Sequence, residues 1–236
     1  MTIDDAYAIQ SAWMATKLSS GRRILGHKIG LTSKTMQRSS NIDEPDYGTL
    51  LDDMFYRDGA AIPTDRFIHL RIEAELAFVL GKDLGGSSCT LFDVLDATSY
   101  VTPALEILDA RMHRTDPETG RRRTVRDTIS DNAANAAVVL GGRAFKPSLV
   151  DIDLRRIGTI VSKNGDVEES GLAAGVLNHP AYGIAWLVER LNRQGVSLKK
   201  GEVVLSGSFI RPIDVKAGDT IVADFGELGS VAAYFK

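Results

Sequence analysis

Apolar and polar residues alternate along residues 71–80, and this alternation predicts a strand with one buried face. The apolar residues on that face are Ile72, Ala74, Leu76, Phe78 and Leu80. A second strand is predicted at residues 101–110, which are mostly apolar but include Glu106 and Asp109. Further strands are predicted at residues 157–163, 203–205, 220–225 and 230–235, with Asn164-Gly165 as a hairpin turn.

Helical spacing of apolar residues, together with capping residues, predicts helices elsewhere in the chain. They span residues 3–18, 91–98, 130 to about 140, and 180 to about 191. Residues 22–65 are rich in Gly, Ser, Asp and Pro, which predicts loops and short strands. No linker or low-complexity segment divides the sequence. The pattern therefore predicts one α+β domain over residues 1–236, with more sheet than helix.

The composition is that of an ordinary folded protein, and it narrows the possible functions. The 236 residues carry 28 Lys and Arg against 31 Asp and Glu, and this net charge of −3 argues against nucleic-acid binding. No apolar run approaches the roughly 20 residues of a membrane-spanning helix, and the first residues do not resemble a secretory signal. A single cysteine, Cys89, argues against disulfides and thiolate metal sites. We expect a cytoplasmic protein with no membrane or nucleic-acid partner.

Three glutamates stand in otherwise apolar rows of the two central strands. Glu73 and Glu75 are two residues apart and so point to the same face, with Cα atoms roughly 7 Å apart. Glu106 lies between Ala104 and Leu108 on its own face. Carboxylates among apolar neighbours are costly unless positive charge compensates them. The three therefore suit one hard cation, Mg²⁺ or Mn²⁺. The alternative is that each pairs with a nearby arginine or lies at a solvated edge.

Two further residues are candidates for a chemical role. Lys28 stands between Gly26 and Gly30, where it could bind a carboxylate or polarise a carbonyl oxygen. Asp46 follows Pro45 in a turn that could aim its carboxylate into a cleft as a base. From these short motifs alone, a surface lysine and a turn aspartate are the simpler interpretations.

Other patterns add less. Four arginines between positions 121 and 126 could bind an anionic substrate, face solvent or bridge subunits. The four histidines lack metal-ligand spacing, and the sequence has no phosphate-binding loop, dinucleotide fingerprint, nucleophile elbow or zinc-peptidase motif. These absences argue against nucleotide-driven, redox-cofactor and zinc-peptidase chemistry.

Several long motifs, in order, resemble one family. RIEAELAFVL and TPALEILDAR are similar to the metal-binding core of the fumarylacetoacetate hydrolase superfamily. GHKIGLTSK, EPDYGTLLDDM, DTISDNAANA, GVLNHP and LSGSFIRP are similar to its 2-hydroxypentadienoate hydratase branch. The resemblance covers nearly the whole chain. It implies a mixed β-sandwich or barrel with peripheral helices, and homo-oligomers that are often pentamer-based. Family members usually carry an additional N-terminal segment, which could contribute to assembly or to closing the site.

The resemblance also assigns roles to residues. Glu73, Glu75 and Glu106 match the family's metal ligands, for Mg²⁺ or Mn²⁺. Lys28 matches an active-site lysine. Asp46 matches an aspartate that is typical of the hydratases, whereas related 4-oxalocrotonate decarboxylases typically have an apolar residue there. The implied reaction adds water at C4 of a small 2-oxo acid and needs no organic cofactor.

The resemblance further implies a seven-carbon dicarboxylate as the substrate, and its distal carboxylate would need a partner among Arg121–Arg126, Arg211 and His113. Alternatives are hydration of 2-oxopent-4-enoate, decarboxylation of 2-oxohex-3-enedioate, and acylpyruvate-type C–C hydrolysis. The stretch VRDTISDNAANA lacks the Gln and Lys that are usual in the hydrolases, which weakens the last. From a different class, the chain could be a non-catalytic partner of a related enzyme, but its intact candidate residues argue against that.

Overall fold

The strands of the protein form two β-sheets, as the computed structural model shows for residues 1–149 and 151–236. The larger sheet has the order β2-β1-β10-β5-β6-β7-β3, and β11 also pairs with β5. Its strands are β1 (Ile24–Gly30), β2 (Asp46–Leu51), β3 (Phe55–Arg57), β5 (Leu70–Leu80), β6 (Thr98–Asp109), β7 (Asn135–Leu140), β10 (Val203–Leu205) and β11 (Ile213–Asp214). The smaller sheet, of order β4-β13-β12-β8-β9, contains β4 (Ala60–Ile62), β8 (Gly158–Lys163), β9 (Asp166–Leu172), β12 (Thr220–Asp224) and β13 (Ser230–Phe235).

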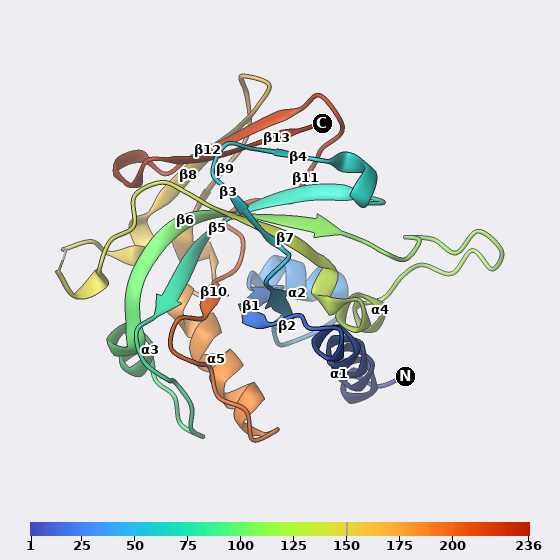
Figure 1. Ribbon diagram of the computed structural model, residues 1–236, viewed down its shortest axis with the longest axis horizontal. Helices are drawn as coiled ribbons and strands as arrows, with labels where there is room; N and C mark the ends of the chain where they lie inside the picture. The colour runs from blue at the N-terminus through green and yellow to red at the C-terminus, as the bar shows by residue number, and fades with distance from the viewer. Residues whose placement is uncertain (150) are drawn as a thin grey trace.

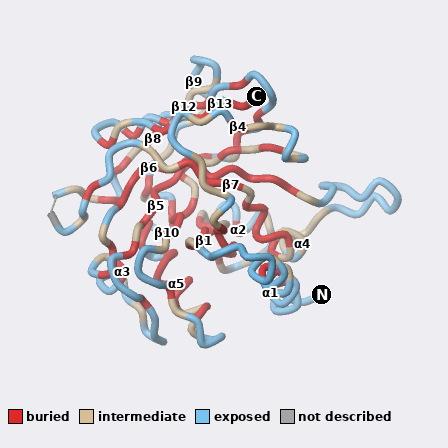
Figure 2. Tube along the Cα trace, viewed as in Figure 1, coloured by how far each residue is buried: buried red, intermediate tan, exposed pale blue. Residues whose placement is uncertain are grey.

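Helices lie at the periphery of these sheets (Figure 1). They are α1 (Ile3–Ser19), α2 (Lys34–Ser40), α3 (Leu91–Ala97), α4 (Val125–Ser130) and α5 (Pro180–Asn192). Side chains from both sheets, among them Phe78, Val161 and Phe235, belong to one apolar cluster, so the sheets pack face to face. Figure 2 shows buried residues along β5, β6 and β7 and exposed residues along the outer loops. The core thus gives the central strands a fixed position.

The alternation along residues 71–80 is confirmed. The apolar residues from Ile72 to Leu80 at alternate positions of β5 are all buried. β6 pairs with β5 in antiparallel register, with Glu73 directly opposite Glu106. Directly opposed residues of an antiparallel pair share one face of the sheet. The fold therefore places these two glutamates side by side on the face opposite the apolar row.

The two long helices and one hairpin lie where the sequence predicts them. α1 begins with a capping box between Thr2 and Asp5, and α5 begins at a proline. The turn between β8 and β9 consists of Asn164 and Gly165, both with positive φ, as a tight hairpin with this twist requires. Residues 22–65 contain the expected short strands and also helix α2, which the composition did not predict.

The helix expected at residues 130–140 is wrong. α4 ends at Ser130, where that helix should begin, and Asn135–Leu140 forms strand β7. β7 lies between β6 and β3, and its Val138 and Val139 are fully buried. Helix propensities differ by less than about 1 kcal/mol per residue, so pairing on both edges overrides the alanines of this segment. The helix expected over 91–98 ends one residue early, because Thr98 begins β6.

A strand from near the C-terminus separates the N-terminal strands from the centre of the larger sheet. β10 pairs in parallel with β1 and antiparallel with β5. Leu205 of β10 is the partner of Lys28 on one side and of Ala77 on the other. The position of Lys28 relative to β5 therefore depends on residues that lie far away in the sequence.

Candidate active site

A cavity of about 520 Å³ opens beside β1, β2 and β5. Lys28, Asp46 and Glu73 line it, together with residues of segments 31–36 and 208–212. Glu75 and Glu106 are fully buried next to Glu73. The five residues singled out in the sequence therefore meet at one place, although they come from four different strands.

The register of β5 against β6 brings three carboxylates together. Glu73 and Glu75 share one face of β5, and Glu106 faces Glu73 from β6. One carboxylate oxygen from each of the three lies within 4.8 Å of the others. Oxygens at such separations can all contact a single divalent cation of the hard class.

Burial makes this cluster electrostatically costly without a cation. Burial, followed by the charge of Glu106, raises the pKa of Glu73 to about 7, although Lys28 opposes the shift. Burial and the charges of Glu106 and Glu73 raise the pKa of Glu75 well above its ordinary value. Like charges in a water-poor site disfavour one another's ionised form. A divalent cation would remove this cost, and it would keep all three side chains ionised.

The donor atoms also fit a metal. Within the described residues, Glu75 Oε1 and Glu106 Oε2 are buried and have no hydrogen-bond partner. The second oxygen of each group is held in place: the Gly207 N–H donates to Glu75 Oε2 over 2.8 Å, and Asn135 Nδ2 donates to Glu106 Oε1 over 2.9 Å. The free oxygens are thus oriented and unpaired. A set of carboxylate oxygens without nitrogen or sulfur suits Mg²⁺ or Mn²⁺.

Sequence reasoning missed the two residues that hold these carboxylates. Gly207 lies in an SGS stretch, and its φ of +116° and close contact with the Thr32 side chain leave no room for a Cβ. Asn135 begins β7, in the segment expected to be helical. Neither position carries a signal of its own in the sequence, because its partner glutamate lies on another strand.

Lys28 is buried against the carboxylate cluster. It is only 3% exposed, its Nζ lies 3.3 Å from Glu106 Oε1, and it donates a hydrogen bond to the Ala133 carbonyl over 3.3 Å. Burial by itself lowers the pKa of this amine, but the charges of Glu106, Asp46 and the other two glutamates outweigh it and raise the pKa well above the ordinary value. Lys28 therefore stays protonated across the physiological range.

Asp46 faces the same cavity from the first position of β2. Its backbone pairs with Gly30, and only 2% of the residue is exposed. Among the described residues nothing hydrogen-bonds its Oδ1. Burial raises its pKa to about 6, even though the charge of Lys28 acts in the opposite direction. A carboxylate with a pKa near 6 and a free oxygen is suited to accept a proton at neutral pH.

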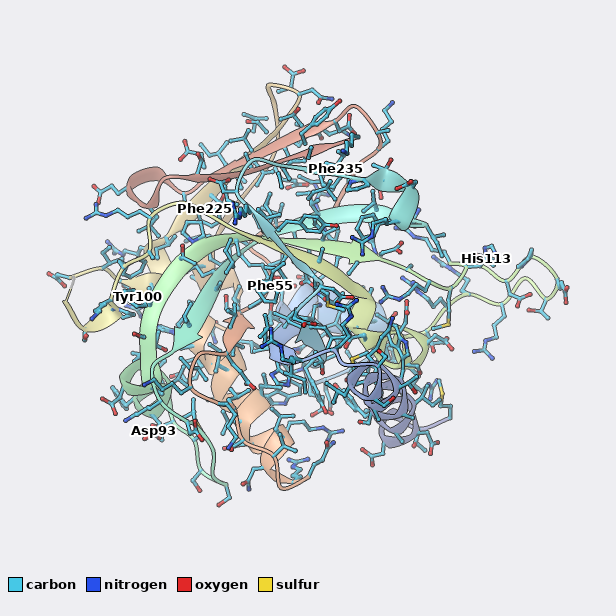
Figure 3. The ribbon with its side chains drawn as sticks, in the orientation of Figure 1. Phe55, Asp93, Tyr100, His113, Phe225 and Phe235 are labelled. Atoms are coloured by element: carbon cyan, nitrogen blue, oxygen red, sulfur yellow. The ribbon has the colours of Figure 1, made fainter. Side chains whose placement is uncertain are left out.

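The basic residues suggested for substrate binding are only partly at the cavity. Arg123 and Arg211 line it. Arg121 forms an ion pair with Asp127 on the exposed surface. Figure 3 shows His113 on the arm that projects from the body, and this residue is not part of the cavity lining in the described chain. Arg71, which the sequence analysis did not select, also lines the cavity.

None of the helices in the part of the chain that the structure describes is both long and apolar enough to span a bilayer. This agrees with the absence of a long apolar run in the sequence.

Comparison with known proteins finds relatives over the whole chain. The family model described as fumarylacetoacetate (FAA) hydrolase C-terminal matches residues 21–236. A 2-oxo-hept-4-ene-1,7-dioate hydratase of Escherichia coli is 59% identical over 235 residues, which cover 100% of this chain and 87% of that protein. A 2-keto-4-pentenoate hydratase of Paraburkholderia xenovorans (strain LB400) is 38% identical over 236 residues, with coverage of 100% and 85%.

The solved structures confirm the expected architecture. A 4-oxalocrotonate decarboxylase from Pseudomonas putida G7, complexed with magnesium and adipate, matches with a TM-score of 0.93 and 33% identity. The match covers 100% of this chain and 87% of that one. A mixed sheet structure with few, peripheral helices is therefore shared between the two proteins.

Proposed function

This chain belongs to the fumarylacetoacetate hydrolase family, and on that premise we propose that it is a divalent-metal-dependent hydratase of 2-hydroxy-2,4-dienoates. The proposed reaction converts 2-oxohept-4-ene-1,7-dioate, through its dienol tautomer, to 4-hydroxy-2-oxoheptane-1,7-dioate, in the catabolism of aromatic compounds by meta-cleavage. The observation that carries the proposal is the convergence of three glutamates, a protonated lysine and a proton-accepting aspartate on one cavity. The 59% identity to a hydratase of this diacid supports the choice of substrate.

We propose Mg²⁺, or Mn²⁺ in its place, as the cofactor, held by Glu73, Glu75 and Glu106. When bound, such a cation supplies Lewis acidity to the carboxylate and C2 oxygen of a 2-oxo acid. The free carboxylate oxygens and the all-oxygen donor set described above support this assignment.

In this proposal Lys28 stabilises negative charge on the C2 oxygen, and Asp46 accepts a proton from water. Ketonisation of the dienol moves a proton from the C2 hydroxyl and adds one at C5, which leaves a C3=C4 double bond conjugated to the C2 carbonyl. Lys28 Nζ, which lines the cavity next to the carboxylates, donates a hydrogen bond to the C2 oxygen as charge develops there. Asp46 Oδ1 accepts a proton from the water whose oxygen bonds to C4, and C3 gains a proton. The sum is the addition of one water.

The alternatives have weaker support. The decarboxylase that shares the fold is 33% identical to this chain, against 59% and 38% for the two hydratases. Asp46 occupies a position that is apolar in the decarboxylases, by the resemblance noted above. A non-catalytic partner would not need five ionisable residues in one place, four of them buried at an energetic cost.

The function is tested by offering 2-hydroxyhepta-2,4-dienedioate and 2-hydroxypenta-2,4-dienoate side by side in the presence of Mg²⁺. We expect the diacid to gain the mass of one water as the dienol absorbance falls, with kcat/KM at least about tenfold above that of the monoacid. Hydration of the monoacid alone would assign the enzyme to another substrate. Release of carbon dioxide or of a cleaved acid would replace hydration by decarboxylation or hydrolysis.

The substitution Gly30→Ala should lower turnover at least about 100-fold, because misplacing a catalytic group by about 1 Å costs about this factor in rate. We expect little loss of stability. A Cβ at Gly30 would lie 2.2 Å from Asp46 Oδ1 and 3.1 Å from Lys28 Nζ, so the aspartate must move. Gly175→Ala is the matched control, since it also lines the cavity and an added Cβ meets no atom within 4 Å. Steady-state kinetics and thermal melting check both; equal turnover of the two variants would contradict the role of Asp46.

The expected homo-oligomer, pentamer-based or otherwise, and the cytoplasmic location remain proposals. The oligomer is checked by light scattering of the purified protein.

A further inference from the structure

Arg71 continues the row of functional side chains on β5. Residues 71, 73 and 75 lie on one face of the strand, so Arg71 follows Glu73 along the cavity, away from Glu75. Its partner on β6 is Leu108, which also lines the cavity and adds an apolar wall beside the guanidinium. The strand thus carries the proposed metal ligands at one end of the row and a cation at the other.

Arg123 reaches the same cavity from another segment. It follows the arm over residues 111–122 that projects from the body in Figure 1, and its backbone N–H donates to the Arg114 carbonyl. Arg71 Nε and Arg123 Nη1 are both buried, and neither has a hydrogen-bond partner within the described residues. Two partly buried arginines, each with a buried and unpartnered donor atom at one cavity, are an arrangement that favours an anion.

The acidic groups near these arginines are paired with other cations, exposed to solvent or part of the carboxylate cluster. Asp131 pairs with Arg111, and Asp127 caps α4 and pairs with Arg121. Asp214, near Arg71, has a side chain that is 72% exposed, so solvent screens its charge. The remaining neighbour is Glu73, which belongs to the carboxylate cluster.

The other arginine of the cavity behaves differently. Arg211 is paired with Glu169 at 2.6 Å, and its side chain is 83% exposed. Its charge is therefore already neutralised and largely hydrated. This contrast separates Arg71 and Arg123 from the other cationic candidates.

The spacing along β5 matches the length of a seven-carbon diacid. Residues two apart on a strand are separated by roughly 7 Å. The terminal carbons of an extended seven-carbon chain are also roughly 7 Å apart, since its six bonds of about 1.5 Å follow a zigzag. When the 2-oxo acid end lies at the three glutamates, the far carboxylate would lie roughly 7 Å further along β5, toward Arg71.

We infer that Arg71 and Arg123 bind the distal carboxylate of a dicarboxylic 2-oxo acid and select it over shorter monoacids. This inference rests on the proposed function, because it takes the 2-oxo acid end to lie at Glu73, Glu75 and Glu106. Both guanidiniums act in substrate binding, and neither takes part in proton transfer.

A binding experiment tests the inference without turnover. Adipate and hexanoate have equal chain length and differ by one carboxylate, so calorimetric titration of each into the Mg²⁺-loaded protein isolates the distal group. Arg123→Met and Arg71→Met should each weaken adipate at least about tenfold and leave hexanoate within about twofold, as expected for loss of a charge-assisted hydrogen bond. Arg122→Met, an exposed neighbour, should change neither ligand. If both variants keep the wild-type preference for adipate, the inference is overturned.

Kinetics separate this inference from the proposed function. In both variants KM for 2-hydroxyhepta-2,4-dienedioate should rise at least about tenfold, while kcat/KM for 2-hydroxypenta-2,4-dienoate stays within about twofold. A wild-type protein that hydrates neither acid but whose adipate preference is lost in the variants would refute the hydratase and retain the carboxylate site. An equal loss on both acids would refute the selective role. Should Arg71→Met fail to fold because it lies in a central strand, Arg123→Met, outside the sheets, decides alone.

Discussion

Replacing Glu106 by glutamine is expected to lower kcat/KM for hydration at least about 1,000-fold and to abolish tight Mg²⁺ binding. The change keeps the shape of the side chain and removes one of the three carboxylates that meet within 4.8 Å. It also removes the carboxylate that lies 3.3 Å from Lys28 Nζ. Loss of a metal's electrostatic contribution of several kcal/mol corresponds to this factor, at 1.36 kcal/mol for each tenfold. Calorimetric Mg²⁺ titration and steady-state kinetics measure the two effects.

A matched carboxylate outside the cavity serves as the control for this experiment. Glu202 is partly buried, and its Oε2 lies 3.7 Å from His27 Nδ1. Glu202→Gln should leave Mg²⁺ affinity and turnover within about twofold of the wild type. Near-normal turnover of Glu106→Gln, with the protein folded by circular dichroism, would show that Glu106 is not a metal ligand.

Replacing Asp46 by asparagine should lower kcat by about 10²–10⁴-fold while Mg²⁺ affinity changes less than about threefold. Asp46 lies outside the set of three carboxylates proposed to hold the metal. Its Oδ1 has no hydrogen-bond partner among the described residues and is proposed to accept the proton of water. This separation of turnover from metal affinity distinguishes Asp46→Asn from Glu106→Gln.

The pH profile provides a second measure of the same role. The base form of Asp46 is the carboxylate, whose pKa is raised to about 6 by burial. The wild-type rate should therefore be constant above this pKa and fall as the pH drops below it, because the carboxyl becomes protonated. The residual rate of Asp46→Asn should lack this acid limb. Asp43→Asn, an exposed neighbour, should retain both the rate and the limb; a limb that persists in Asp46→Asn would belong to another group.

The carboxylate cluster was predictable because strand periodicity is local. The spacing of Glu73 and Glu75 places them on one face without any knowledge of the fold. The same rule, applied two residues earlier, would have placed Arg71 beside them, so that signal was present in the sequence. What periodicity could not supply was the register that sets Glu106 opposite Glu73, because pairing depends on a partner strand.

The hydrogen bonds that hold Glu106 and Glu75 in place could not be predicted from the sequence, for a different reason. Asn135 bonds Glu106 across 29 residues, and Gly207 bonds Glu75 across 132. Such contacts follow from the complete sheet order, which no local pattern encodes. The error at residues 130–140 has the same origin: an alanine-rich segment favours a helix by itself, and only its two neighbouring strands make it β7.

The insertion of β10 between β1 and β5 also has a consequence for biosynthesis. The glutamates of β5 and β6 are complete once residue 109 has been translated, whereas β1 joins their sheet only through residues 203–205. At about 5–20 residues per second, the ribosome needs on the order of ten seconds to add the intervening chain. During that interval β1, with Lys28, lacks the strand that pairs with both β1 and β5 in the larger sheet. Catalytic competence is thus a property of the finished chain, acquired in a late step of its maturation.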